Sequence, residues 1–318
     1  MTSPDFQAPT DDDFSSSPAV ERGHLLTEQE NPNSANLDQM SALEIVDVFC
    51  QEDQQVITAV SAAREALAEA IDYTAKSLAE GGRLFYVGAG TSGRLGVLDA
   101  AECPPTFCTP PEMVQGILAG GAAALLRSSE GLEDLADDGA AAIAHHRVTH
   151  RDVVMGITAG GTTPYVHGAI AAARQRGART LFLACVPSEQ VSIEVDVDIR
   201  LLVGPEVLAG STRLKAGTAT KLALNILSTG TMVKLGKVYG NRMVDVSVTN
   251  SKLYDRSLRI LRDLTGIDRD TAATLLEQSG RKVKLALLMH WAEVDAETGD
   301  RLLSDHHGQL RKALAAAK

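Results

Sequence analysis

A short apolar run that ends in closely spaced glycines, residues 84–93, constrains this chain more than any other stretch. Its apolar half predicts a buried strand that enters a tight turn. The following residues predict a helix that Thr91 and Ser92 cap and that stops before Pro104. A strand, a glycine turn and a helix N-terminus form an anion site from backbone N–H groups and the helix dipole. Glu102 would then lie just past the helix, close to whatever the turn binds.

The spacing of Gly88, Gly90 and Gly93 also satisfies the dinucleotide fingerprint G-x-G-x-x-G. A nicotinamide site needs an acidic residue at the end of the next strand, about 20 residues further on. The next predicted strand, residues 113–118, is followed by alanine and two glycines, with no acid. The hydroxyls inside the turn suit a terminal phosphate better than a pyrophosphate. The pattern therefore favours a sugar-phosphate site over a dinucleotide site or a turn that serves only packing.

Composition limits the classes of protein to which the chain can belong. Its 318 residues are 44% hydrophobic, enough for one large core or two modest ones. A net charge of -11 argues against nucleic acid or an anionic membrane as a partner. The four cysteines lie at no metal-ligand or disulfide-framework spacing, and no apolar run approaches the roughly 18 residues that would cross a bilayer. The first 17 residues lack the features of a signal peptide, so we expect a cytoplasmic protein.

The N-terminal quarter of the chain predicts a tail and a helical arm. Residues 1–20 are acidic and polar and predict a disordered tail. A first helix begins near Ser41, and a longer second helix runs from Gln54 to Ala79. Two amphipathic helices ahead of the first strand indicate an arm suited to packing on a partner subunit.

From Gly82 onwards predicted strands alternate with helices, which indicates an α/β fold with a mostly parallel sheet covered on both faces. Further strands are predicted at residues 152–158, 180–186 and 199–203. A second unit of strand, glycines, hydroxyls and helix contains Gly161, Thr162 and Thr163. Both glycine turns should open at the carboxyl edge of the sheet, where such folds bind ligands. Residues 21–255 form this domain, and residues 256–318 predict a small helical bundle with turns at Thr265-Gly266 and residues 298–300.

Residues 210–237 predict a helix that is apolar except along one stripe. The stripe holds Ser211, Lys215, Thr218, Asn225 and Thr229, with Lys221 at its margin. A polar stripe on a buried helix meets either a ligand or a polar network, and a hydrated subunit interface is the alternative. Arg213, Lys215 and Lys221 supply local positive charge that the acidic chain otherwise lacks.

Two glutamates follow the predicted strand ends. Glu102 follows the first glycine turn, and Glu133 belongs to an acidic segment after the second strand. Two carboxylates near a bound sugar phosphate suit general acid and base roles, although acidic residues at helix starts are also common surface caps. His145, His146 and His150 lack carboxylate or cysteine companions, which favours a solvated helix end over a metal site.

Six segments together carry a resemblance to a known family. They are Thr27-Glu28 with Asn31-Pro32, residues 88–96, residues 99–106, residues 130–134, residues 210–218 and residues 240–246. Over residues 24–318 the chain closely resembles the bacterial N-acetylmuramic acid 6-phosphate etherases, which have the sugar isomerase (SIS) fold, a flavodoxin-like three-layer sandwich. The resemblance implies cleavage of a D-lactyl ether without metal or nucleotide cofactor, in a homodimer whose sites lie near the subunit interface.

The resemblance also implies roles for individual residues. Glu102 is the acid at the lactyl oxygen and Glu133 the base at C2, or the reverse. Together with the patterns above, it implies that phosphate and sugar are bound by Gly90, Thr91, Ser92, Gly93, Arg94, Gly161, Thr162, Thr163, Ser211, Thr212, Arg213, Lys215 and Lys221.

The second glycine turn departs from the family pattern. Where the family reads Ala-Ser-Gly-Arg-Thr-Pro, this chain has residues 159–164 as Ala-Gly-Gly-Thr-Thr-Pro, so a hydroxyl and a cation are missing. This loss favours a non-catalytic sugar-phosphate sensor, and an aldose-ketose isomerase is a further alternative. The presence of both Glu102 and Glu133 favours the etherase.

Overall fold

The computed structural model describes residues 21–127, 130–246, 248 and 250–317. The tail predicted for residues 1–20 lies outside this range. None of the described helices is long and apolar enough to span a bilayer.

A five-stranded sheet forms the centre of the molecule, with every neighbouring pair of strands parallel. The strand order is β2-β1-β3-β4-β5, with bounds Leu84–Gly88 for β1, Val114–Leu118 for β2, Val153–Ile157 for β3, Arg179–Ala184 for β4 and Val197–Arg200 for β5. The alternating α/β fold with a parallel sheet is confirmed. The strand predicted at residues 199–203 is displaced, because its pairing with β4 ends where Arg200 lies opposite Ala184. Gly88 lies opposite Ile157, so the two glycine turns leave the same edge of the sheet.

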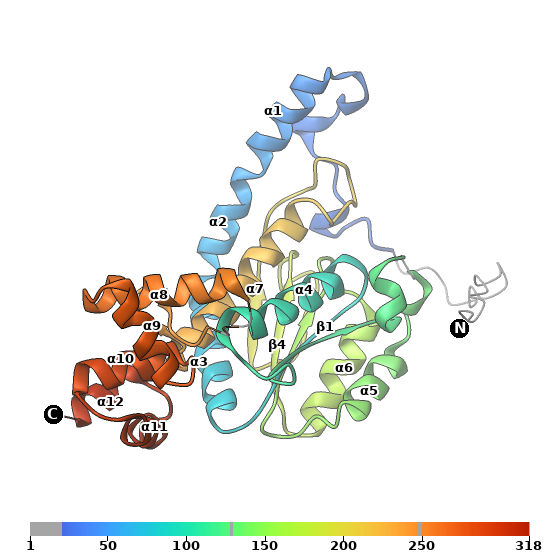
Figure 1. The fold of residues 1–318 in the computed structure, drawn as a ribbon. Coiled ribbons are helices and arrows are strands. Elements are labelled where there is room, and N and C mark those ends of the chain that lie inside the picture. The colour runs from blue at the N-terminus through green and yellow to red at the C-terminus, as the bar shows by residue number, and fades with distance from the viewer. Residues whose placement is uncertain (1–20, 128–129, 247, 249, 318) are drawn as a thin grey trace, which may run out of the picture.

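Helices cover both faces of the sheet and make the three-layer sandwich that was expected (Figure 1). One face packs against α3 (Arg64–Ala79), α4 (Gly90–Phe107) and α7 (Lys215–Lys234). The other face packs against α5 (Ala136–His145) and α6 (Pro164–Gln175). Side chains of a strand alternate between the two faces, so Leu84 and Tyr86 enter the first core while Phe85 and Val87 enter the second.

Helix α4 does not stop before Pro104, and that prediction is wrong. The helix continues through Pro104 and Pro105 to Phe107, and Cys108 closes it in the left-handed conformation. Proline removes a backbone donor and disfavours a helical residue before it. Here Cys103 and Phe107 are buried in the same core as α7, and this packing outweighs the local preference.

The N-terminal arm projects from the sandwich, as Figure 1 shows for α1 and α2. Helix α1 (Ala42–Glu52) begins where predicted, because Ser41 and Glu44 form a reciprocal capping box. The predicted second helix is instead two helices, α2 (Gln54–Ala62) and α3, because the backbone leaves the helical conformation at Ala63. Between residue 21 and the arm, the chain forms the short 3-10 turns η2 (Leu26–Glu28), η3 (Pro32–Ser34) and η4 (Leu37–Gln39).

The C-terminal part is helical and lies to one side of the sandwich (Figure 1). It contains α8 (Ser251–Thr265), α9 (Arg269–Gln278), α10 (Val283–Ala292), α11 (Ala296–Asp305) and α12 (Leu310–Ala316), after a short hairpin of β6 (Val238–Tyr239) and β7 (Arg242–Met243). Gly266 ends α8 as predicted. The turn predicted at residues 298–300 is wrong, because Gly299 lies inside α11 where a Cβ atom would come within 2.7 Å of Leu285.

Candidate active site

The first glycine turn brings the start of α4 directly onto β1. A Cβ atom at Gly93 would lie 2.4 Å from the carbonyl oxygen of Gly88, so only glycine permits this approach. Ala89, rather than Thr91 or Ser92, is the residue before the helix, and no side chain caps it. Thr91 and Ser92 therefore stand in the first turn of α4, half-buried, beside the N–H groups that lack a helical partner.

Arg94 follows Gly93 near the start of α4 and forms a hydrogen bond to a neighbouring loop. Its Nε donates a hydrogen bond of 3.0 Å to the carbonyl oxygen of Ala124. Ala124 belongs to η5 (Gly121–Leu125), which follows β2. Arg94 thus connects the first glycine turn to the chain that leads towards Glu133, and its remaining guanidinium nitrogens keep donors for an anion.

The second glycine turn leaves β3 and leads into α6. Gly161 adopts a positive φ of 77°, and the hydroxyls of Thr158 and Thr163 lie 2.8 Å apart in a hydrogen bond. No side chain caps α6 either. Thr162 is half-buried and lines a cavity of about 550 Å³ together with Pro164 and His167.

A threonine from the N-terminal segment covers the second turn. Thr27 is buried, and a Cβ atom at Gly160 would lie 3.6 Å from its hydroxyl oxygen. Within the part of the chain that the structure describes, this hydroxyl has no hydrogen-bond partner. Sequence reasoning treated Thr27 only as part of a family segment and missed its position over Gly160.

Glu133 lies beside the second glycine turn. Its carbonyl oxygen accepts a hydrogen bond of 3.0 Å from the N–H of Tyr165, the second residue of α6. The residue is half-buried and follows η6 (Glu130–Leu132). The fold therefore brings Glu133 to the edge of the sheet where both turns open.

Glu102 does not lie where the sequence placed it. It is an exposed residue inside α4 rather than past the end of the helix. At a rise of 1.5 Å per residue, Glu102 lies about 18 Å along the helix from Gly90. The prediction that Glu102 lies just past the helix and close to its own glycine turn is therefore wrong, whereas its role in the reaction stays a prediction.

A third segment, residues 210–214, borders the first turn. Helix α7 begins only at Lys215, so Ser211, Thr212 and Arg213 precede it in a turn instead of lying on its polar stripe. A Cβ atom at Gly217 would lie 3.6 Å from the carbonyl oxygen of Thr212 and 3.7 Å from the Thr91 methyl group. Ser211 and Thr212 are half-buried and Arg213 is exposed.

Lys215 is buried and paired within the protein, contrary to the predicted stripe. Its side chain is 1% exposed, and its Nζ lies 2.5 Å from the Glu52 carboxylate of α1. Burial works to raise the pKa of Glu52, but hydrogen bonds from Lys215, Asn33 and Asn31 outweigh it and hold that pKa below its ordinary value. Lys215 thus joins the arm to α7 rather than offering a cation to a ligand.

Glu206 sets the start of α7. Its buried carboxylate accepts the N–H groups of Lys215 and Ala216, both at 2.9 Å. Burial raises the pKa of Glu206, and these two hydrogen bonds oppose the rise. The positive end of this helix is therefore neutralised within the protein, which the sequence pattern did not reveal.

The polar stripe of α7 consists of Thr218, Lys221, Asn225 and Thr229. Asn225 donates a hydrogen bond of 2.7 Å to Asp99, which is buried in α4 and also accepts from Tyr86 and Ser228. Burial raises the pKa of Asp99. Part of the stripe therefore meets a polar network, while Thr218, Lys221 and Thr229 remain exposed.

The geometry gathers Thr91, Ser92, Glu133, the 210–214 segment and the second turn at one edge of the sheet, whereas Glu102 lies towards the other end of α4. This edge offers hydroxyls and unpaired helix N–H groups, which suit a phosphate. Among the described residues, no group of histidine, cysteine and carboxylate side chains is placed to hold a metal ion.

Known families match the chain in two parts. Residues 66–174 match the N-terminal SIS domain of glucokinase regulatory protein, and residues 240–298 match the C-terminal lid domain of that protein. Among solved structures, a phosphoheptose isomerase from Francisella tularensis is 18% identical, with a TM-score of 0.48 over 61% of this chain and 100% of that chain.

Curated relatives match nearly the whole chain. Proteins named N-acetylmuramic acid 6-phosphate etherase are 73% identical in Crocosphaera subtropica, over 94% of this chain and 98% of the relative, and 72% identical in Nostoc punctiforme, over 92% and 96%. The relative of the same name in a Synechocystis species is 70% identical, over 93% of this chain and 97% of its own length.

Proposed function

This chain belongs to the N-acetylmuramic acid 6-phosphate etherase family, and we propose how its residues divide the work of that reaction. The enzyme is a lyase that cleaves the D-lactyl ether of N-acetylmuramic acid 6-phosphate to N-acetylglucosamine 6-phosphate and D-lactate. The observation that carries this function is identity of 70% or more over nearly the full length of curated etherases. This function places the enzyme in carbohydrate metabolism, and in amino-sugar metabolism in particular.

The reaction needs one base and one acid. In the ring-opened sugar, the C1 aldehyde acidifies the proton on C2. A base removes that proton, the C2–C3 double bond forms, and the C3–O bond breaks while an acid protonates the departing lactyl oxygen. Water then adds its hydroxyl to C3 and a proton returns to C2, which completes the product sugar.

We assign the base to Glu133 and the acid to Glu102. A hydrogen bond from the Tyr165 N–H holds the backbone of Glu133 at the start of α6, beside the second glycine turn. The hydroxyls of Thr91 and Ser92 and the first N–H groups of α4 would hold the phosphate. Ser211 and Thr212 approach from the 210–214 segment and would contact the sugar.

The position of Glu102 supports a homodimer in which each site uses both chains. Leu98, one turn before Glu102 on α4, is 49% exposed, and Ile226 and Val233 of the adjacent α7 are 40% and 50% exposed. On the arm, Leu43 and Ile57 are 70% and 61% exposed. Apolar side chains in such numbers favour burial against another surface. A two-fold interface over this face would carry Glu102 to the partner's glycine turns.

Free thiols support a reducing compartment, and we place the enzyme in the cytoplasm. All four cysteines belong to the described residues and none is in a disulfide; two of them, Cys103 and Cys185, are buried. Burial raises the pKa of each of these thiols to about 12.

D-lactate release from N-acetylmuramic acid 6-phosphate tests the function directly. Wild-type protein should release D-lactate, and Glu102→Gln should lower the rate by at least about 100-fold, the usual contribution of a general acid. Glu65→Gln, which changes an exposed glutamate of α3 that pairs only with exposed Arg64, is the matched control and should keep full activity. Saturable binding of the sugar phosphate by the wild type without any release would overturn the enzyme in favour of a sensor.

A further inference from the structure

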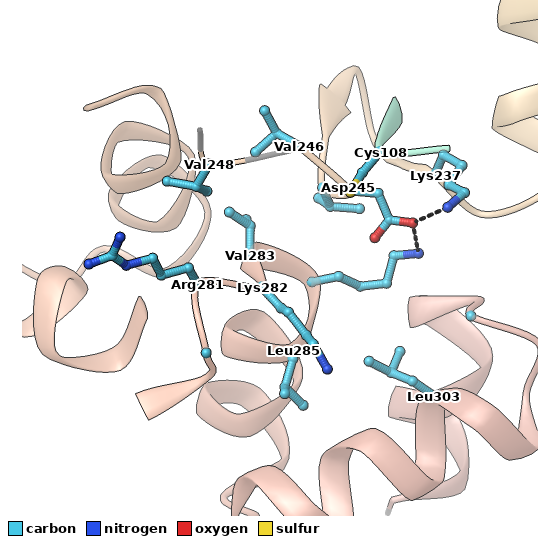
Figure 2. Close-up of a pocket in the computed structure, with 14 residues that line it drawn as sticks. Cys108, Lys237, Asp245, Val246, Val248, Arg281, Lys282, Val283, Leu285 and Leu303 are labelled. Carbon is cyan, nitrogen blue, oxygen red and sulfur yellow. Dashed lines mark hydrogen bonds and ion pairs between the residues drawn. The ribbon is translucent and has the colours of Figure 1, made fainter. Parts of the chain in front are cut away.

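A cavity of about 590 Å³ separates the sheet domain from the C-terminal helices, away from the glycine turns (Figure 2). Cys108, which closes α4, and Lys237, which follows α7, line it from the sheet domain. The opposite wall comes from residues 281–285 at the start of α10 and from Leu303 of α11. Asp245 follows the short hairpin and belongs to a family segment to which the proposed reaction gives no role.

Two lysines in this cavity share one carboxylate oxygen. The Nζ of Lys284 lies 2.7 Å from Oδ2 of Asp245, and the Nζ of Lys237 lies 3.0 Å from the same atom. Figure 2 shows both ion pairs as dashed lines from the Asp245 carboxylate, one of them to Lys237. The Lys284 side chain is 8% exposed and that of Lys237 is 21% exposed, so neither ammonium is well hydrated.

The other cations of the cavity have partners of their own. Lys282 pairs with Asp300 and Arg281 pairs with Glu277, all exposed. With both lysines protonated, the group of Lys237, Lys284 and Asp245 carries one more positive than negative charge in a poorly hydrated place. Burial lowers the pKa of Lys284 and nearby Lys237 adds to this, whereas Asp245 opposes it. A buried positive charge that lacks a counter-charge is costly, and a bound anion would relieve it.

We propose that this cavity binds a small anion, a phosphate or a carboxylate, between Lys237 and Lys284. Ammonium groups with free N–H donors are phosphate and carboxylate ligands in proteins. The apolar walls from Val244, Val246, Val283 and Leu285 accommodate an aliphatic body attached to the anionic group. Cys108, which closes the helix that carries Glu102, lines the same cavity.

Titration with inorganic phosphate at constant ionic strength, against chloride, tests the site in the full-length protein. Methyl resonances of Val244, Val246 and Val283 report on this cavity alone, whereas phosphate bound at the glycine turns would shift others. We expect a saturable shift of these valine methyls. A parallel titration with acetate separates a carboxylate preference from a phosphate preference, and saturation by either anion supports the site.

Variants separate an anion site from a clamp that only joins the two domains. Lys284→Met should abolish the shift of the valine methyls. Lys237→Met, which serves if Lys284→Met does not fold, should weaken the affinity for the anion at least tenfold. Lys282→Met is the matched control and should leave the shift unchanged. It removes an ammonium group from the same wall, but this ammonium already pairs with Asp300. Asp245→Asn removes the competing carboxylate and should tighten anion binding about tenfold.

Absence of a saturable shift with both anions would overturn the proposal. So would a shift that Lys284→Met and Lys237→Met leave unchanged, since the anion would then sit elsewhere. If Asp245→Asn only lowers the melting temperature and does not tighten anion binding, the lysines and Asp245 are a structural clamp.

Discussion

Two inactive variants of this enzyme should restore each other when they form one dimer. The sugar's C3 lies about five bonds, or about 6 Å, from the phosphorus atom. Glu102 lies about 18 Å along α4 from the turn that would hold the phosphate. A glutamate side chain spans only about 4 Å, so about 8 Å remains uncovered within one chain. We therefore expect Glu102 of one chain to act with Glu133 of the other.

The perturbation pairs Glu102→Gln in one chain with Glu133→Gln in its partner, each chain carrying a different affinity tag. In the purified heterodimer, one site receives both intact glutamates and the other site receives neither. That heterodimer should release D-lactate at about half the wild-type rate, and an unselected equal mixture at about one quarter, because half of its dimers are heterodimers. Each variant alone should be at least about 100-fold slower than the wild type.

The assay follows D-lactate enzymatically, with sedimentation confirming dimers in every sample. A heterodimer of Glu102→Gln with Glu65→Gln is the control, because it also keeps one complete site and should match the test heterodimer. Activity of the test heterodimer no higher than that of either parent would refute the reasoning, since both glutamates of a site would then come from one chain. A monomeric wild type that remains active would refute it as well.

Two further outcomes test the packing that supports the site. Lys215→Met leaves Glu52 charged and buried without its partner, which should lower the free energy of unfolding by about 3–5 kcal/mol in urea titrations. In the folded protein the pKa of Glu52 is below its ordinary value of 4.5, so the pair stabilises the fold at neutral pH and this stabilisation is lost as the pH falls below that value. A difference in unfolding free energy between wild type and variant that stays constant down to strongly acidic pH would contradict this. Gly93→Ala places a Cβ atom against the Gly88 carbonyl and should cost about 1–3 kcal/mol and weaken substrate binding, whereas Gly131→Ala, with nothing within 4 Å, should be nearly neutral by thermal unfolding.

Local patterns in the sequence located the strands, the last of them displaced by a few residues, the two glycine turns and the starts of α1 and α2. The short apolar run before the glycines predicted a buried strand, and the helix start near Ser41 is where the capping box with Glu44 forms. Features of this kind depend on residues within a few positions of one another, so the chain displays them without its fold. The pairing of Glu102 and Glu133 as an acid–base pair came from the family segments and stays a proposal.

Only the tertiary structure decided where the charged side chains point. Lys215 turns to Glu52, more than 160 residues away, because Glu206 caps α7 at that residue and so sets which way the first turn faces. Helix α4 runs through two prolines because Cys103 and Phe107 are buried against other elements, and this moves Glu102 away from its own turn. Contacts between distant segments outweigh local preference at these positions, and no pattern within a short window of sequence contains them.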